Sequence, residues 1–396
     1  MIKSIEELEL KGKRVLLRVD FNVPLTDDGK VADDKRIVRT LPTIDAIIKG
    51  GGIPVIVSHL GRPKGAPDPK FSLKPVSEYL INKFGYRVLF CTDFPSENAR
   101  KLTTAAVNGE IILLENIRFF AGETKNDPEL AKKLAKMGDI YVNDAFGTAH
   151  RAHASTAAVA ELFSEKAAGK LMMEEVNFLQ KSTKNPERPF TAILGGAKVS
   201  DKLGVIENLI NKCDNIVIGG GMAFTFLKAM GKEIGKSLLE AEQVELTKNL
   251  LEKAKSKGVK ILLPADVAVA DKFEDRENPQ IVSASAIPAD ALGMDIGTET
   301  VKEFEKIINT SKTIVWNGPM GVFEFPGFAK GTFAIASAVA NATKNGALSV
   351  IGGGDSASAV KKLGFEKQVS YISTGGGATL EFLEGKELPG VKALEI

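Results

Sequence analysis

TIVWNGPMGVFE, residues 313–324, is an apolar run that ends abruptly at Asn317 and continues into a glycine-containing turn. The same pattern recurs in the second half of the chain at FTAILGGAKVSDK (190–202), NIVIGGGMAF (215–224), LSVIGGGDSAS (348–358) and VSYISTGGGATL (369–380). The apolar runs themselves, which we expect to be strands, are 190–194, 215–219, 313–317, 348–352 and 369–373. Short runs that are apolar throughout, rather than alternating, are typical of parallel strands covered by helices on both faces. The repeated order of strand, glycines and helix therefore predicts an α/β domain with a parallel sheet.

The first half of the chain contains a second set of such runs. They lie at RVLLRV (14–19), IPVIVS (53–58), RVLF (87–90), IILLE (111–115) and IYVN (140–143), and KILLP (260–264) adds one to the second half. Between the sets, LMMEEVNFLQKS has the spacing of an amphipathic helix and ends at the breaker-rich KNPERP. We therefore predict two doubly wound parallel-sheet (Rossmann-like) domains joined by a helix, with a cleft between them.

The expected boundaries follow from these runs. They are residues 1–170 for the first domain, 171–188 for the connecting helix and hinge, 189–378 for the second domain, and 379–396 for a C-terminal tail that could pack back on the N-terminal domain.

Composition narrows the class of protein. Hydrophobic residues make up 44% and charged residues 26%, which argues against disorder, and 52 Lys and Arg against 50 Asp and Glu leave no basic field for nucleic acid or membrane lipid. Two cysteines, Cys91 and Cys213, provide no disulfide framework, and no apolar stretch approaches the length of a membrane span. We expect a cytoplasmic protein.

Arginine is concentrated in the first half, where nine of the eleven arginines lie at or before Arg151. Ligands of α/β sheets bind outside the carboxyl ends of the strands, and Arg36, Arg62, Arg118 and Arg151 follow strand ends, beside His59. Guanidinium groups about 4 Å apart repel each other by roughly 4 kcal/mol per pair at an effective dielectric of about 20. The pattern favours a small polyanion with phosphate and carboxylate groups, although each arginine alone is equally compatible with a structural ion pair.

Glycine takes the corresponding place in the second half, and glycines before a helix N-terminus are typical of phosphate binding. Lys198 and Lys202 supply side-chain cations for a polyphosphate. Asp355 would repel phosphate unless a divalent cation intervened, which suggests Mg²⁺ held mostly by phosphate oxygens and water. The alternative interpretation of Asp355, as a plain helix N-cap, is equally compatible with the pattern.

Other nucleotide motifs fit poorly. Walker A requires a glycine where Met230 stands, five places before Gly235 and Lys236. Residues 352–357 match the dinucleotide pattern G-x-G-x-x-A, but the next strand ends at Ser373 without the acid that would bind a ribose. A nicotinamide-dependent dehydrogenase and a non-catalytic protein that binds a phosphorylated metabolite remain as alternatives.

The segments RVDFNVP (18–24), SHLGRP (58–63), GGAKVSDK (195–202), WNGPMGVFE (316–324) and GGGDS (352–356) carry a resemblance over essentially the whole chain. In order and spacing the chain resembles the phosphoglycerate kinase family. The resemblance implies reversible phosphoryl transfer between ATP and the carboxylate of 3-phosphoglycerate, forming 1,3-bisphosphoglycerate and ADP, with Mg²⁺ as cofactor. It also implies small-molecule partners only, a monomer, and closure of the domains about residues 170–188.

The resemblance further implies which residues act. The substrate-binding set is Asp20, Phe21, Asn22, Arg36, His59, Leu60, Gly61, Arg62, Arg118 and Arg151. The nucleotide-binding set is Gly196, Lys198, Lys202, Gly219, Gly220, Gly221, Gly293, Asn317, Glu324, Gly353, Gly354, Asp355 and Ser356, with Asp355 nearest the metal. The catalytic set is Arg36, Lys198, Gly353 and Gly376. A carboxylate nucleophile is ionised at pH 7, so this chemistry needs no general base.

Overall fold

Six parallel strands form the sheet of the N-terminal part of the chain in the computed structural model, which describes residues 1–396. The order across the sheet is β3-β4-β2-β1-β5-β6. The strands are β1 (Arg14–Arg18), β2 (Ile53–Val57), β3 (Arg87–Cys91), β4 (Glu110–Leu114), β5 (Ile140–Asn143) and β6 (Lys166–Ala168). Every residue of β2 and β5 is buried, as continuous apolar runs predict for strands with both faces covered.

A second parallel sheet of six strands lies in the C-terminal part, in the order β15-β14-β13-β7-β8-β9. Its strands are β7 (Phe190–Leu194), β8 (Asn215–Ile218), β9 (Lys260–Leu262), β13 (Thr313–Asn317), β14 (Leu348–Gly352) and β15 (Tyr371–Ile372). The predicted α/β fold class with two doubly wound parallel sheets is confirmed. The last strand is shorter than the predicted run 369–373.

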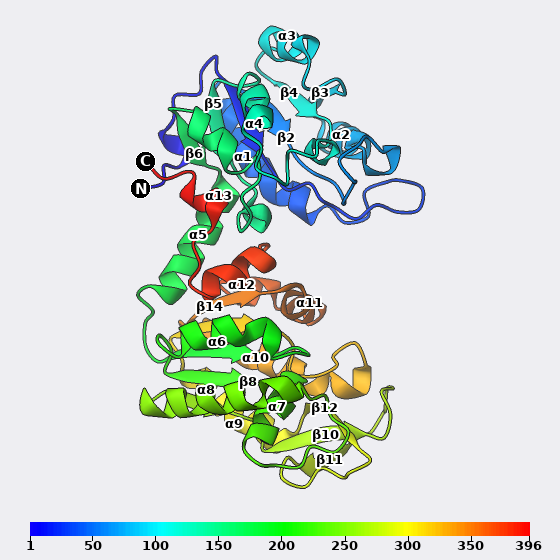
Figure 1. Ribbon diagram of the computed structural model, residues 1–396, viewed down its shortest axis with the longest axis vertical. Helices are drawn as coiled ribbons and strands as arrows, with labels where there is room; N and C mark the ends of the chain where they lie inside the picture. The colour runs from blue at the N-terminus through cyan, green and yellow to red at the C-terminus, as the bar shows by residue number, and fades with distance from the viewer. The chain divides into compact units, whose positions relative to one another are not determined.

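Helices connect the strands and cover the sheets (Figure 1). The helices that accompany the first sheet are α1 (Lys35–Lys49), α2 (Lys74–Phe84), α3 (Glu97–Ala105), α4 (Pro128–Ala135) and α13 (Pro389–Lys392). The helices that accompany the second sheet are α6 (Leu203–Leu209), α7 (Met222–Ala229), α8 (Val244–Ser256), α9 (Thr298–Thr310), α10 (Lys330–Lys344), α11 (Gly354–Lys362) and α12 (Gly377–Leu383). None of the helices is both long and apolar enough to cross a lipid bilayer.

The contacts divide the chain into two units within which most packing occurs. Unit 1 comprises Met1–Val176 and Glu387–Ile396, and unit 2 comprises Asn177–Lys386. Helix α5 (Lys170–Thr183) contains the boundary, and it ends before the predicted limit at 188 because KNPERP cannot continue a helix. The C-terminal segment belongs to unit 1 through hydrogen bonds such as Gly390 N–H to the carbonyl of Ala149, 2.8 Å.

A three-stranded antiparallel sheet in unit 2 was not predicted. It consists of β10 (Asp266–Ala270), β11 (Gln280–Ser283) and β12 (Leu292–Ile296), with β10 in the middle. β11 is short and mostly exposed, and β12 contains Gly293 and Asp295, which are uncommon in strands. Neither segment therefore shows the apolar run by which the other strands were predicted.

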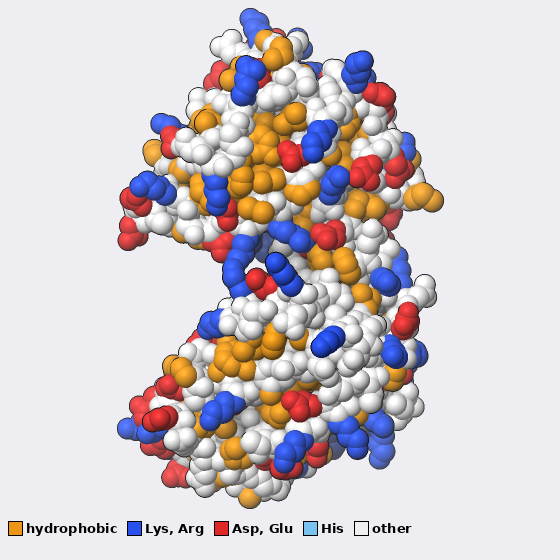
Figure 2. All heavy atoms as spheres, turned by 180° about the vertical axis from the view of Figure 1, so that it is seen from behind, with side chains coloured by type: hydrophobic (Ala, Val, Ile, Leu, Met, Phe, Trp, Pro, Cys, Tyr) orange, Lys and Arg blue, Asp and Glu red, His pale blue; other side chains and the backbone are white.

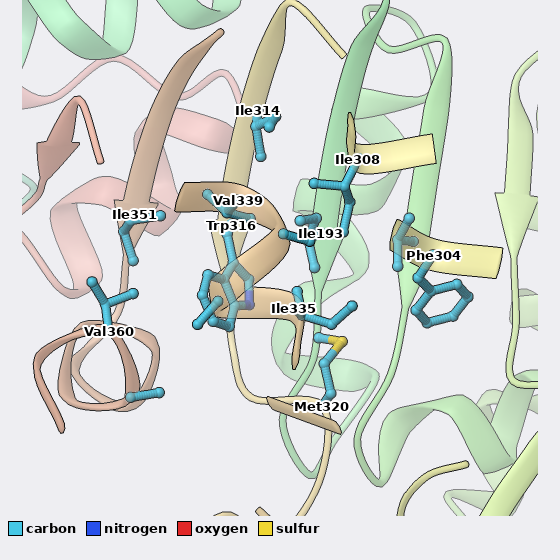
Figure 3. Packing of buried hydrophobic residues seen from close by; sticks show 14 of the residues in the cluster. Ile193, Phe304, Ile308, Ile314, Trp316, Met320, Ile335, Val339, Ile351 and Val360 are labelled. Carbon is cyan, nitrogen blue, oxygen red and sulfur yellow. The ribbon is translucent and has the colours of Figure 1, made fainter. Parts of the chain in front are cut away.

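Charged side chains of both signs are interspersed over the surface in Figure 2, consistent with the near-zero net charge. The larger core of unit 2 lies around Trp316, whose side chain is fully buried (Figure 3). Its indole N–H donates to the carbonyl of Gly318, 2.8 Å away, so the ring has its polar group satisfied. Ile351 on the neighbouring β14 and Ile335 on α10 belong to the same cluster.

Truncation of Ile351 to alanine should lower the free energy of unfolding of unit 2 by about 2–5 kcal/mol, because it removes fully buried methyl groups and leaves a cavity. The matched change Ile281→Ala, at a side chain that is 44% exposed, should alter it by no more than about 0.5 kcal/mol. Urea unfolding followed by the fluorescence of Trp316, the only tryptophan, measures both. Equal losses in the two variants would contradict the assignment of this core.

Candidate functional site

Three of the four predicted arginines of unit 1 line one pocket of about 420 Å³. Arg62 follows β2, Arg118 follows β4, and Arg151 follows β5. The lining residues are Arg62, Pro63, Arg118, Thr124, Arg151, Ala152 and His153. This arginine pocket has no carboxylate in its lining, so an anion is the ligand that would balance its charge.

Arg36, the fourth arginine, does not line this pocket. It lies in the first turn of α1, and its Nη1 donates to Asp20 Oδ2 at 2.9 Å and to the carbonyl of Asn22 at 3.2 Å. That all four arginines share one rim stays a prediction for Arg36, whose guanidinium is held by Asp20 in this arrangement. The Arg36 side chain remains 40% exposed, so a ligand can still reach it.

His59 is buried, with only 3% of its surface exposed. Its Nδ1 lies 3.3 Å from Nη2 of Arg18, a residue of β1 that was not predicted to be functional. Burial, and then the positive charge of Arg18, hold the pKa of His59 well below its usual range. His59 is therefore neutral at pH 7, and the positive charge beside it belongs to Arg18.

The carboxylate of a buried acid, Glu123, balances the positive charge of Arg18. Glu123 is fully buried, and its carboxylate lies 4.0 Å from Arg18 Nη2 and accepts from the Ser155 hydroxyl at 2.6 Å. Ser155 Oγ in turn accepts from Arg18 Nε at 2.8 Å. His153, in the pocket lining, lies 3.8 Å from the same carboxylate, but burial and Arg18 lower its pKa to about 4 and keep it neutral. Sequence reasoning missed this network because its members are far apart in the chain and look like ordinary polar residues.

The other predicted substrate residues surround the backbone of the loop after β2. Asn22 Oδ1 accepts from Gly61 N–H at 2.8 Å, while Phe21 and Leu60 are buried and anchor their loops in the core. Asn22, Leu60 and Gly61 line a second hollow of about 610 Å³, which is closed on another side by Phe71. They therefore shape the loop on which Arg62 lies rather than the lining of the arginine pocket.

In unit 2 the carboxyl ends of three adjacent strands are level, since Asn317 of β13 pairs with Leu194 of β7 and Gly352 of β14. The order in which the chain adds strands reverses between β7 and β13, and α/β proteins bind ligands at positions of this kind. A pocket of about 550 Å³ lies there. This glycine pocket is lined by Gly195, Gly196, Ala197, Lys198, Asp201, Lys202, Asn317, Gly318, Pro319, Gly353, Gly354, Asp355, Ser356, Gly376 and Leu380.

Close backbone contact explains the glycines at the base of the pocket. A Cβ on Gly318 would lie 2.2 Å from the carbonyl oxygen of Gly195, and a Cβ on Gly195 would lie 2.0 Å from that of Pro319. Gly318 also has a φ of +102°, which side chains rarely allow. Ser356 fixes the same turn, because its hydroxyl accepts from Gly318 N–H at 2.7 Å. The two loops can therefore approach only without side chains.

Lys202 and Asn317 meet inside this pocket. The Lys202 ammonium donates to Asn317 Oδ1, and Asn317 Nδ2 is buried without a hydrogen-bond partner. Burial lowers the pKa of Lys202 to about 8, although Asp201 and Asp355 oppose the shift. A buried cation and an unsatisfied amide donor are both groups that a phosphate would stabilise. Lys198, in contrast, is exposed and has no ion pair in this arrangement.

Asp355 lies within the first turn of α11, and Gly353 is the N-cap of that helix. The alternative interpretation of Asp355 as the N-cap is therefore wrong. Its exposed carboxylate lines the glycine pocket, as does Gly376 before α12. No group of three or more His, Cys, Asp or Glu side chains that could hold a metal ion occurs in the chain, so Asp355 would have to share a cation with ligand oxygens.

The remaining predicted nucleotide residues lie outside the lining of the glycine pocket. Gly219, Gly220 and Gly221 follow β8, and Gly220 N–H donates to the carbonyl of Met320 at 2.8 Å. Gly293 is on β12, where a Cβ would lie 2.0 Å from the ring of Phe224. Glu324 is exposed after β13.

Comparison with known proteins covers the whole chain. The family model described as phosphoglycerate kinase matches residues 5–386. A phosphoglycerate kinase of Koribacter versatilis is 54% identical over 398 residues, covering 99% of this chain and 98% of its own. "Phosphoglycerate kinase 3, cytosolic" of Arabidopsis thaliana is 52% identical over 394 residues, covering 100% and 98%. The structure of phosphoglycerate kinase from Coxiella burnetii aligns with a TM-score of 0.93 at 44% identity, covering 100% of this chain and 99% of that one.

Replacement of Lys202 by methionine should raise the free energy of unfolding at pH 7 by about 1–2 kcal/mol, because the folded state no longer buries a charge. The pKa of Lys202 is about 8 when folded, against about 10.4 when unfolded. Between these two pKa values the unfolded wild-type protein binds more protons than the folded one, so the free energy of unfolding of wild type rises with pH. The difference in free energy of unfolding between Lys202→Met and wild type should therefore shrink over that range. Urea unfolding of wild type, Lys202→Met and the exposed control Lys306→Met from pH 7 to 10 measures this; a pH-independent advantage would contradict it.

Proposed function

The chain belongs to the phosphoglycerate kinase family, and from this premise we propose that the arginine pocket of unit 1 binds the phosphorylated acid and the glycine pocket of unit 2 binds the phosphates of the nucleotide. The activity itself is that of the family: a phosphotransferase that moves a phosphoryl group reversibly between ATP and the carboxylate of 3-phosphoglycerate, in glycolysis. The dehydrogenase and binding-protein alternatives are thereby excluded.

One observation above all others supports the proposal that the arginine pocket binds the phosphorylated acid. Arg62, Arg118 and Arg151 line a pocket with no acid in its wall, and Glu123 below it is already occupied by Arg18 and Ser155. The unbalanced positive charge suits a molecule with phosphate and carboxylate groups, to each of which an arginine can donate two parallel hydrogen bonds. We propose that Asp20, Asn22, Leu60 and Gly61 shape this site, and that buried His59 and Phe21 support it from below.

In the glycine pocket, the phosphates would meet backbone N–H groups before α11, the Lys202 ammonium and the free Asn317 amide. Such donors suit a polyphosphate because a helix N-terminus alone contributes only about 0.3–1 kcal/mol to an exposed charge. We propose that Gly196, Gly354 and Ser356 belong to this phosphate site. Gly219 to Gly221, Gly293 and Glu324 would bind the nucleoside end, with Glu324 on the ribose.

The chemistry requires charge stabilisation rather than proton abstraction, because the attacking carboxylate is already ionised. During transfer, negative charge spreads over the equatorial oxygens of the phosphoryl group. We propose that the exposed cations Arg36 and Lys198 meet these oxygens from the two units, together with the backbone N–H groups at Gly353 and Gly376. Arg36 would exchange its contact with Asp20 for the phosphoryl group.

The metal requirement is part of the proposal. Mg²⁺ is commonly bound through one or two carboxylates, substrate phosphates and water, and the single exposed carboxylate of Asp355 in the glycine pocket fits that pattern. When bound, the ion would neutralise phosphate charge during transfer. A monomeric state, a cytoplasmic location and closure of the units around α5 stay predictions.

Alanine at Lys198 should lower kcat by about 100-fold, on the order of 3 kcal/mol, with a much smaller effect on KM for ATP, because its charge acts chiefly in the transition state. Arg36→Ala should behave similarly. A coupled assay with 3-phosphoglycerate and MgATP measures both, with the exposed Lys306→Ala as the charge-matched control. A near-normal kcat for Lys198→Ala would refute its proposed role.

Asp355→Asn should increase the Mg²⁺ concentration needed for half-maximal activity by about tenfold, because a neutral amide is a weaker ligand than a carboxylate. The experiment is a Mg²⁺ titration of activity at fixed ATP, with the exposed Asp290→Asn as the matched control. If the variant and the control require the same Mg²⁺ concentration as wild type, Asp355 does not hold the ion.

A further inference from the structure

Asn116 is a fully buried amide two residues after the end of β4 and two residues before Arg118. Its Nδ2 donates to the carbonyls of Leu60, at 2.7 Å, and Phe71, at 2.8 Å. Its Oδ1 accepts from Arg118 N–H at 3.0 Å. Both amide hydrogens and the amide oxygen are therefore used, and all three partners are backbone groups.

The two carbonyls are the ends of one loop. The loop of residues 61–70 follows Leu60, beyond the end of β2, and reaches Phe71 just before α2. It carries Arg62. The ring of Phe71 packs on Gly61 so closely that a Cβ there would lie 2.3 Å from the ring. Asn116 thus closes the base of the loop, and the Phe71 ring keeps the first turn of the loop in place.

Arg118 is held at both ends through the same arrangement. Asn116 accepts from its backbone N–H, and its Nη1 donates to the carbonyl of Gly61 at 2.7 Å. Gly61 is next to Leu60, the residue that Asn116 binds on the other loop. The position of the Arg118 guanidinium therefore depends on one amide group, both through its own backbone and through the loop that it contacts.

We propose that Asn116 is a positioning residue for the acid substrate, which sets the relative placement of Arg62 and Arg118 in the arginine pocket. This inference rests on the proposed function of that pocket. Two guanidinium groups can each donate a pair of hydrogen bonds to one ligand only if their separation matches it, so a small shift of either weakens binding. Asn116 itself does not line the pocket.

Only asparagine fits all three contacts. Aspartate at 116 would face two carbonyl oxygens without donors, whereas serine retains the oxygen that caps the turn before Arg118 but is too short to reach both carbonyls. Asn116→Ser therefore keeps the cap and releases the loop, and Asn116→Ala removes both. Asn108 is the matched control, since its Nδ2 also donates to two carbonyls of unit 1, those of Ile48 at 2.9 Å and Gly52 at 3.1 Å, away from the arginine pocket.

The test is steady-state kinetics of the full-length chain with thermal unfolding of each variant. Asn116→Ser should raise KM for 3-phosphoglycerate by about tenfold, equivalent to about 1.4 kcal/mol, with KM for MgATP changed less than about twofold. Asn116→Ala should raise KM for 3-phosphoglycerate further than Asn116→Ser does. Asn108→Ser and Asn108→Ala should leave both KM values unchanged.

A purely structural role would instead lower the fraction of folded enzyme, and hence the apparent kcat, without moving KM for 3-phosphoglycerate; that result would overturn the inference. If Asn116→Ser does not fold, calorimetric binding of 3-phosphoglycerate to Asn116→Ala and to Asn116→Asp decides instead, because both variants lack the two amide donors, and unchanged affinity in whichever of them folds would overturn the inference equally. Calorimetric binding of 3-phosphoglycerate to Arg118→Ala separates the proposed function of the arginine pocket from the proposed role of Asn116. Normal binding there refutes the assignment of the pocket, whereas lost binding there with normal binding in the Asn116 variants refutes only the role of Asn116.

Discussion

Level carboxyl ends of parallel strands are the constraint on which both candidate pockets depend. In unit 2, Leu194, Asn317 and Gly352 are partners across β7, β13 and β14, so the three loops that follow start at one edge. Loops that start so close together must exclude side chains where they touch, as Gly195 and Gly318 do. The glycines thus serve packing first, and the backbone N–H groups that they leave accessible are a consequence of that packing.

Each pocket contains cations that folding alone does not neutralise. Lys202 is buried with its pKa lowered to about 8, and Arg118 is half-buried with its pKa also lowered by burial and by Arg18. Both shifts mean that the folded protein holds these charges at a cost in free energy, which an anionic ligand would offset. Glu123, 4.0 Å from Arg18, offsets part of that cost in unit 1, and its charge also favours the charged form of Arg118. The stability of the empty protein and its affinity for anions are therefore opposed.

Features encoded by neighbouring residues could be predicted from the sequence, and features encoded by distant ones could not. The runs at 190–194, 313–317 and 348–352 correspond to strands residue for residue, because apolar composition and the following glycines are local signals. The Arg18 contact with Ser155 joins residues 137 positions apart, and no local pattern marks either as functional. In the antiparallel sheet, exposed β11 was missed for a related reason, because it is specified by its partner β10 rather than by its own composition. The buried apolar run of β10, in contrast, is a local signal that was overlooked.

Residue type alone also failed to separate Arg36 from the other arginines. All four follow strand ends, yet Arg36 lies on α1 beside Asp20, whereas Arg62 and Arg151 lie on loops and Arg118 in a short 3-10 helix, with no acid in the pocket wall. This difference fits different tasks, because a cation that must meet a phosphoryl group only during transfer needs a partner to leave, while cations that bind the substrate need rigid placement. Under the proposed function, the buried amide of Asn116 would supply such rigidity to Arg118, and Asp20 would supply an exchangeable partner to Arg36. Strength of attachment, rather than charge, would thus distinguish the proposed role of Arg118 from that of Arg36.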